Sequence, residues 1–214
     1  MRIHLKSIGN STKMRHEGDK EQHIIGICGG IGSGKSVVSR LLRLRGEAVY
    51  DCDMEARRLM DSSAEVLQEL NIRYGDKVCP PQGPINRAEL AQRIFSNDTE
   101  RQWLNCLVHR MVREDVSTWA ESLFATGSKR CFVESAIPAT SGLTAMCSRI
   151  IIVDAPESLR IARVKDRDGL DESSIHQRIL SQQEEDRQTR ESGCPVFTIN
   201  NDNATSVLAN IDLI

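Results

Sequence analysis

A glycine-rich stretch near the N-terminal end holds residues whose types and spacing could bind phosphate. It reads Gly-Gly-Ile-Gly-Ser-Gly-Lys-Ser and matches the pattern G-x-x-x-x-G-K-[ST] throughout. Glycines let a backbone bend closely around a triphosphate, the lysine reaches its β and γ phosphates, and the last hydroxyl can bind Mg²⁺. We therefore expect this stretch to bind a nucleoside triphosphate. The expected binding residues are Gly29, Gly30, Ile31, Gly32, Ser33, Gly34, Lys35, Ser36 and Val37.

The segments on either side of this stretch are those that a phosphate loop requires. Ile24 to Cys28 is an apolar run of strand length, and Val37 to Leu44 places apolar residues at helical spacing before Gly46. A helix that starts at the loop adds free N–H groups and the positive end of its dipole. This context favours phosphate binding over the alternative, a glycine-rich turn with an ordinary surface lysine.

Other short segments have the character of strands and are each followed by a polar residue. They are residues 47–50 before Asp51, 131–133 before Glu134, 150–153 before Asp154 and 196–199 before Asn200. Continuous apolar strands that alternate with helices predict a five-stranded parallel sheet covered on both faces, the core of a P-loop NTPase. Ligands of such sheets bind at the carboxyl ends of the strands, where these polar residues fall.

Long helical stretches separate some of these strands. Residues 53–126 are almost wholly helical in pattern, which is far more than a crossover between parallel strands needs. Residues 157–192 form a second, highly charged helical stretch. Separate helices are predicted over Ala64 to Tyr74, Asn86 to Phe95, Asp98 to Phe124 and, at the end, Ala204 to Leu213.

The composition of the 214-residue chain argues against several classes of protein. A net charge of −2 and an aromatic content of 4% indicate neither a nucleic-acid surface nor a base-stacking platform. The seven cysteines are scattered without a C-x-x-C pair, so we expect reduced thiols and a cytoplasmic location. No apolar run is long enough to span a membrane. Residues 1–22 are expected to form a flexible tail, and the oligomeric state is left open.

Carboxylates after two predicted strands could take part in phosphoryl transfer. A small-molecule kinase needs a carboxylate near the acceptor hydroxyl and cations around the transferred phosphoryl group. From spacing alone, Asp53 fits equally this carboxylate and the N-cap of the next helix, whereas Asp51 fits a polar strand end. Glu134 could hold Mg²⁺ through water or simply end its strand. No Asn-Lys-x-Asp signature is present, which argues against a guanine nucleotide.

Two rows of arginines stand at helical spacing in the charged stretch. Arg160, Arg163 and Arg167 share one helix face, and Arg187 and Arg190 repeat the arrangement. Because acidic residues neighbour both rows, spacing alone favours a solvated face with surface ion pairs. The alternative is a mobile lid whose arginines neutralise the γ phosphate in the transition state.

An ordered set of short segments resembles the dephospho-CoA kinase family, which catalyses the last step of coenzyme A synthesis. The phosphate loop is common to many kinases, whereas this ordered set, from Ile24 to Asp202, is specific. Besides the loop, its segments are Tyr50-Asp51-Cys52-Asp53 with Arg57-Arg58-Leu59, Asn86-Arg87-Ala88-Glu89-Leu90 with Ile94-Phe95-Ser96, Trp103-Leu104-Asn105 with His109, Glu134-Ser135-Ala136-Ile137, Val153-Asp154-Ala155-Pro156-Glu157, Arg163 with Arg167-Asp168, and Ile199-Asn200-Asn201-Asp202.

The resemblance implies transfer of the γ-phosphoryl group of ATP, with Mg²⁺, to the ribose 3′-hydroxyl of dephospho-CoA. It implies a core of the nucleoside monophosphate kinase type, a helical acceptor domain and a lid. The implied core comprises residues 23–52, 127–156 and 193–214, the acceptor domain residues 53–126, and the lid residues 157–192.

The resemblance also implies roles for single residues. Its catalytic residues would be Lys35, Asp53, Arg163 and Arg167, with Asp53 as the base. Asn200 would lie near the adenine. Arg87 and His109 would lie at the acceptor, although a lone helical histidine is more often structural.

The chain departs from the family pattern at two places. Arg110 follows His109 where many members have proline, and Pro138-Ala139-Thr140 replaces an apolar run that ends in Phe-Glu. The second change removes a carboxylate on the acceptor side. It keeps open an ATP-binding regulatory protein without transfer activity. A kinase for another small acceptor, such as a nucleoside monophosphate or shikimate, is a further alternative.

Overall fold

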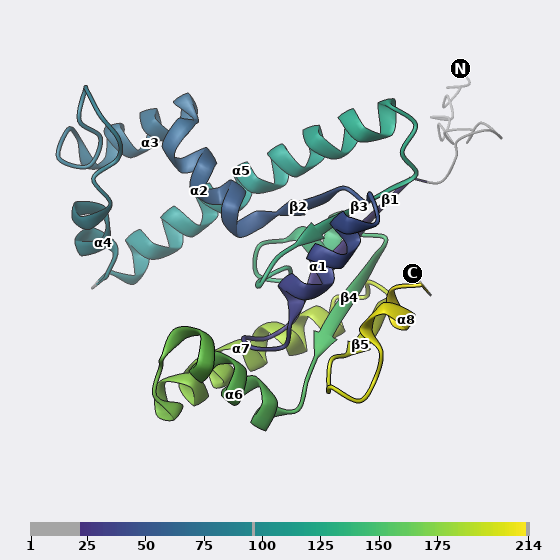
Figure 1. Ribbon diagram of the computed structural model, residues 1–214. Coiled ribbons are helices and arrows are strands. Elements are labelled where there is room, and N and C mark those ends of the chain that lie inside the picture. The colour runs from purple at the N-terminus through teal and green to yellow at the C-terminus, as the bar shows by residue number, and fades with distance from the viewer. Residues whose placement is uncertain (1–21, 96, 213–214) are drawn as a thin grey trace, which may run out of the picture.

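The computed structural model describes residues 22–95 and 97–212, and Figure 1 shows how its elements are arranged. The predicted flexible tail over residues 1–22 lies outside the described residues except for its last residue. Among the described helices, none combines the length and apolar character needed to cross a membrane.

A five-stranded parallel sheet lies at the centre of the molecule, as predicted. Its strand order is β2-β3-β1-β4-β5. The strands are β1 (His23–Cys28), β2 (Val49–Asp51), β3 (Arg130–Glu134), β4 (Arg149–Asp154) and β5 (Val196–Asn200). In the sheet register, Asp51 lies beside Glu134 and Asp154 lies beside Asn200. The polar strand ends therefore lie along one edge of the sheet.

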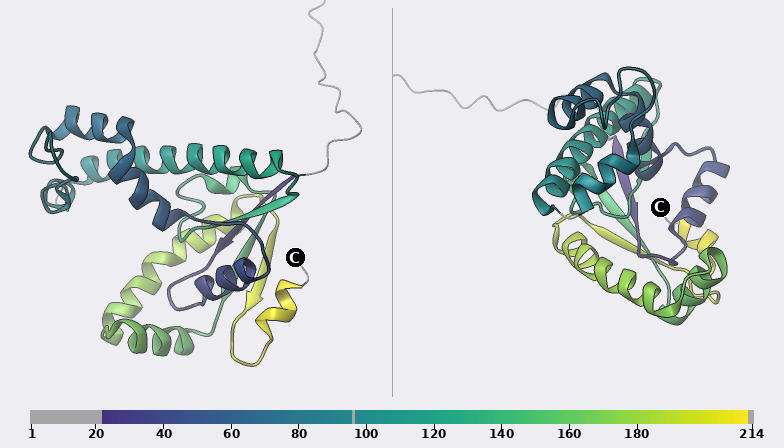
Figure 2. Two further views of the ribbon diagram at one scale, coloured as in Figure 1. Left: turned by 45° about the horizontal axis from the view of Figure 1, so that its top comes forward. Right: turned by 90° about the vertical axis from the view of Figure 1, so that its left-hand side faces the viewer.

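Helices cover both faces of this sheet (Figure 2), because successive side chains of a strand point to opposite faces. One face, which includes Phe132, packs against α1 (Lys35–Leu44) and α8 (Val207–Ile211). On the other face, Val133 packs with side chains of α5 (Asp98–Ala125). Full burial of one such apolar side chain stabilises the fold by roughly 1.5–3 kcal/mol. The cores on the two faces therefore hold the carboxyl ends of the strands in place.

A group of helices between β2 and β3 lies beside the sheet (Figure 1). It comprises α2 (Cys52–Ser62), α3 (Ala64–Tyr74), α4 (Arg87–Phe95) and α5. These helices have a hydrophobic core of their own, which includes Val66, Leu70, Leu104 and Leu107. α3 has the predicted bounds, because Ser63 caps its start and Gly75, with a φ of 70°, follows its end.

The charged stretch of residues 157–192 is helical, as predicted, and forms two helices. α6 (Glu157–Asp168) ends at Gly169, which has a left-handed φ of 64°, and α7 (Glu172–Glu191) starts after its N-cap Asp171. The two helices share a small hydrophobic cluster with the phosphate loop. Its members include Val164, Ile175, Ile179 and Ile31.

Two short elements complete the described part of the fold. The 3₁₀ helix η1 (Leu143–Met146) lies between β3 and β4. α8 is shorter than the predicted helix, because Asp202 accepts the N–H groups of Ala204 and Thr205 in a turn and Ser206 is the N-cap. The predicted end of this helix, at residue 213, lies outside the described residues.

Candidate active site

The phosphate loop presents a row of free backbone donors. Among the described residues, the N–H groups of Gly32, Gly34, Lys35 and Ser36 have no hydrogen-bond partner. Gly34 precedes α1 with a φ of 95°, a conformation that favours glycine. The Ser33 hydroxyl is also unpaired, although this residue is only 1% exposed. A polyphosphate could satisfy these donors together.

Side chains from two other segments approach the loop at its glycines. A Cβ atom on Gly30 would lie 2.2 Å from Arg160 Nη2, and one on Gly34 would lie 2.0 Å from Asn201 Nδ2. The same Asn201 nitrogen donates to the Ser33 carbonyl at 2.8 Å. A side chain at either glycine would therefore displace the guanidinium of Arg160 or the amide of Asn201 from the loop.

Lys35 and Glu134 form an ion pair at the end of β3. Lys35 Nζ lies 2.9 Å from Glu134 Oε1, and the two side chains are 17% and 6% exposed. The pairing of β3 with β1, which leads into the loop, brings these residues together. A buried carboxylate without a partner would be strongly destabilising. The pair therefore neutralises Glu134 and holds the ammonium group beside the loop.

Asp51 caps the helix that follows β2. Its Oδ1 accepts the N–H groups of Asp53 at 3.1 Å and Met54 at 3.0 Å. The N-cap alternative for Asp53 is therefore wrong, whereas Asp51 both ends its strand and caps α2. Asp53 lies exposed in the first turn of α2. Within the described part of the chain its carboxylate has no hydrogen bond or ion pair, so it is available to a ligand.

In the first arginine row, two side chains contact the phosphate loop or the segment beside it, and the third lies at the surface. Arg160 Nε donates to the Ile31 carbonyl at 2.9 Å, and Arg163 Nη2 donates to a carbonyl of the segment after β5 at 2.9 Å. Arg167 instead pairs with Asp168 at the surface. The solvated-face prediction is wrong for Arg160 and Arg163 and confirmed for Arg167.

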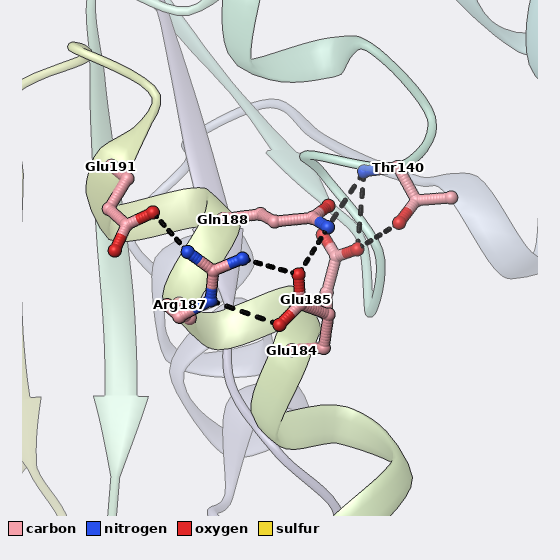
Figure 3. Close-up of polar contacts among 6 residues, drawn as sticks. All are labelled: Thr140, Glu184, Glu185, Arg187, Gln188 and Glu191. Carbon is pink, nitrogen blue, oxygen red and sulfur yellow. Dashed lines mark hydrogen bonds and ion pairs between the residues drawn. The ribbon is translucent and has the colours of Figure 1, made fainter.

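The second arginine row is a solvated face, as its spacing predicts. Arg187 nitrogens lie 2.6 Å from Glu184 and 2.5 Å from Glu191 (Figure 3). Arg190 Nε lies 2.9 Å from Asp186. Such exposed pairs within one helix contribute little to stability. In the described chain Arg187 has no contact with the phosphate loop, whereas Arg190 also lines a pocket that Gly30 lines.

The Arg160 contact predicts an effect on nucleotide affinity. Arg160→Gln removes the guanidinium that holds the Ile31 carbonyl, and a lost hydrogen bond of this kind costs roughly 0.5–1.5 kcal/mol. We expect ATP to bind roughly three- to tenfold more weakly in titration calorimetry. Arg187→Gln, which removes an exposed arginine of α7, is the matched control. Equal ATP affinities for both variants and the unmodified protein would refute this role of Arg160.

A further loop contact comes from a residue that the sequence did not single out. Gln182 of α7 accepts the Ile31 N–H at 2.7 Å. No spacing rule marks a glutamine in a charged helix as a loop contact. At the end of β5, Asn200 is exposed, and its neighbour Asn201 is the residue that contacts the loop.

The residues assigned to the acceptor lie on the helices between β2 and β3. Arg87 Nη2 lies 2.8 Å from Asp61 Oδ1 in an exposed pair, and no contact joins it to the phosphate loop in the described chain. His109 is half-buried on α5, and burial, followed by the charge of Arg113, lowers its pKa, while the charge of Glu185 opposes the shift. The histidine is therefore mostly neutral near pH 7.

The cysteines give a prediction about thiol reactivity. All seven are free. Cys106 is exposed, Cys147 and Cys194 are half-buried, and the other four are buried. Burial raises the pKa of Cys28 to about 12, and burial also raises the pKa of Cys52. Because the thiolate is the reactive form, we expect a chromogenic disulfide reagent to label Cys106 first. Cys106→Ser should remove the fast phase of labelling. A fast phase that persisted in this variant would show that another cysteine is equally accessible, contrary to the structure.

Comparisons with known proteins agree with these features. The profile of the dephospho-CoA kinase family matches residues 23–206. This chain belongs to that family. A dephospho-CoA kinase from Porphyromonas gingivalis is 42% identical over 161 residues, which are 75% of this chain and 78% of the relative. One from Corynebacterium diphtheriae is 33% identical over 189 residues, 88% of this chain and 92% of the relative.

Solved structures support the same P-loop kinase fold. A protein from Thermus thermophilus has a TM-score of 0.68 and 29% identity, with 90% of this chain and 93% of that chain covered. A dephospho-CoA kinase from Campylobacter jejuni has a TM-score of 0.62 and 20% identity, with 88% and 92% covered. The predicted fold class is confirmed.

The structure shows what surrounds the two departures from the dephospho-CoA kinase pattern. Arg110 Nη1 lies 2.8 Å from Glu65 Oε1 in an exposed pair. The segment from Pro138 to Thr140 follows β3, and its backbone N–H groups donate to the carboxylate of Glu185 on α7. A carboxylate is thus present at this segment, although it comes from another part of the chain.

The donors around the start of α1 suit a magnesium ion that is bound together with phosphates. Ser36 lies at the start of α1, and Glu134 ends β3 at the same edge of the sheet. In the described ranges, no group of three His, Cys, Asp or Glu side chains forms a closed metal site. Mg²⁺ keeps several waters and takes few protein ligands, so an open set of oxygen donors fits it.

Proposed function

We propose that this protein transfers the γ-phosphoryl group of ATP to the ribose 3′-hydroxyl of dephospho-CoA, giving coenzyme A and ADP. Membership of the dephospho-CoA kinase family supports this activity. The single structural observation that carries it is the Lys35–Glu134 pair at 2.9 Å beside a loop of free N–H donors. This arrangement offers positive charge where a transferred phosphoryl group needs it.

The proposed chemistry forms one bond and breaks one. The ribose 3′-oxygen attacks the γ phosphorus, the bond from that phosphorus to the β-phosphate oxygen breaks, and ADP leaves. Asp53 accepts the proton of the 3′-hydroxyl. Lys35 and the N–H groups of the loop stabilise the charge on the phosphate oxygens. Bound Mg²⁺, held by Ser36 and through water by Glu134, would supply further charge neutralisation.

The other proposed roles follow the division of the chain. The helices between β2 and β3 bind the acceptor through Arg87 and His109, and Asn200 lies near the adenine. α6 and α7 form a lid, in which Arg163 and Arg167 approach the phosphates when both substrates are bound. In the structure Arg163 already donates to the Gly32 carbonyl of the phosphate loop at 3.4 Å. Arg167 pairs with Asp168 at the surface, so its role requires the side chain to move. We also propose a cytoplasmic location, which the free thiols support.

An acceptor panel tests the proposed activity against its alternatives. Release of ADP from ATP and Mg²⁺ should require dephospho-CoA, and shikimate or a nucleoside monophosphate should not replace it. Turnover with one of those acceptors would instead favour a kinase of another specificity. ATP binding without turnover on any acceptor would favour a regulatory protein. Family membership favours neither alternative.

A further inference from the structure

Glu185 is a buried carboxylate that contacts the segment after β3. It lies on α7 and is 9% exposed. Oε1 accepts the Ala139 N–H at 2.6 Å, and Oε2 accepts the Thr140 N–H at 3.2 Å and the Thr140 hydroxyl (Figure 3). The Thr189 hydroxyl is a further, longer donor at 3.4 Å. N–H and O–H groups therefore satisfy both carboxylate oxygens.

Two helices hold this segment from different sides. The acceptor-side loop, residues 135–142, starts directly after Glu134 at the carboxyl edge of the sheet. Arg113 of α5 donates to the Ser141 carbonyl at 2.6 Å. Glu185 of α7 accepts hydrogen bonds from the N–H groups of the same loop. The loop thus bridges the helices proposed to bind the acceptor and those proposed to form the lid.

The same turn of α7 also contacts the phosphate loop. Gln182 stands three residues before Glu185 and accepts the Ile31 N–H at 2.7 Å. A pocket of about 170 Å³ lies between these contacts, and its lining includes Gly30, Pro138, Arg160, Gln182, Glu185 and Arg190. One helix turn therefore sets the positions of the donor-side and acceptor-side loops relative to each other.

The energetics of Glu185 differ from those of its neighbour in sequence. Glu184 is exposed and pairs with Arg187 within the same helix, a contact of little consequence. In the described chain Glu185 has no ion-pair partner, and N–H and O–H donors compensate its charge. Hydrogen bonds to a charged group are the stronger class, and removal of one partner leaves buried donors unsatisfied. Such a contact specifies the position of the loop.

We propose that Glu185 is a positioning residue for the acceptor. It holds the acceptor-side loop against α7, so that docking of α7 on the phosphate loop also sets the acceptor site. This inference rests on the proposed function, because it concerns the acceptor of that reaction. The carboxylate itself need not touch the substrate, and its effect is transmitted through the backbone of residues 139 and 140.

Glu185→Gln tests this role, because it keeps the size of the side chain but replaces one accepting oxygen by an NH₂ group that cannot accept the Thr140 N–H. We expect kcat/KM for dephospho-CoA to fall about tenfold or more. The KM for ATP should remain within about twofold, and the melting temperature should fall by only a few degrees, because one buried N–H group loses its acceptor. Glu184→Gln is the matched control and should behave as the unmodified protein does.

Thr140→Val supplies a second, independent variant, because it removes only the hydroxyl donor. We expect a smaller loss in kcat/KM for dephospho-CoA, and the double variant should lose less than the sum of the single losses, since both changes disrupt one contact. Unchanged acceptor kinetics in Glu185→Gln, or an equal loss for ATP and acceptor, would overturn the proposal. Failure of the unmodified protein to use dephospho-CoA would instead refute the proposed function.

Discussion

Lys35→Met should lower kcat by about 10²- to 10³-fold, because one charged group that stabilises a transition state contributes this much. Methionine keeps much of the length of the lysine side chain but has no charge for the phosphate oxygens. The variant should also be less stable. It leaves Glu134, 6% exposed, without its cation, and breaking a buried pair in this way costs about 3–5 kcal/mol.

A double variant separates these two effects of Lys35. Lys35→Met with Glu134→Gln removes the unpaired buried charge, so thermal unfolding should show that most of the lost stability returns. Activity should not return with it, because no cation is restored beside the loop. Arg40→Met, at an exposed position on the same helix, controls for loss of positive charge. Recovery of kcat in the double variant would contradict the role given to Lys35.

Asp53→Asn should reduce kcat by about 10²- to 10⁴-fold while ATP affinity stays nearly the same, because a general base contributes this much to a proton transfer. Asparagine has almost the same shape but cannot take the proton of the acceptor hydroxyl. The carboxylate of Asp53 has no partner in the described chain, so its removal should disturb the structure little. Steady-state kinetics and ATP titration measure the two quantities.

Asp51→Asn is the matched control for this prediction. The residue lies two positions earlier and caps α2 through the N–H groups of Asp53 and Met54. Asparagine caps helices about as well as aspartate, so this variant should retain stability and most of its activity. If Asp53→Asn were as active as Asp51→Asn, Asp53 would have no part in proton transfer.

Local sequence signals predicted the parts of the site that consecutive residues form. The eight residues from Gly29 to Ser36 define the phosphate loop by themselves. Apolar strands that end at Glu134 and Asp154 predicted the sheet edge, because carboxyl ends of parallel strands meet at one edge. The break between α6 and α7 had signals too, in Gly169 and the N-cap Asp171, which helical spacing alone overlooked.

Contacts between distant segments could not be predicted from spacing within one helix. Arg160 and Ile31 are 129 residues apart and Gln182 and Ile31 are 151 apart. The spacing of Arg160, Arg163 and Arg167 shows only that they share a face, not what that face contacts. Similarly, Asp51 and Asp53 both stand near a helix start, and only the backbone geometry decides which of them is the cap.

The position of the transferred phosphate tests the central claim most directly. The unmodified protein should be incubated with ATP, Mg²⁺ and dephospho-CoA, and the product analysed by mass spectrometry and phosphorus NMR. We predict one added phosphoryl group, present as a monoester whose phosphorus couples to the ribose 3′ proton. A phosphate at another position, or unchanged dephospho-CoA beside intact ATP, would contradict the proposed function.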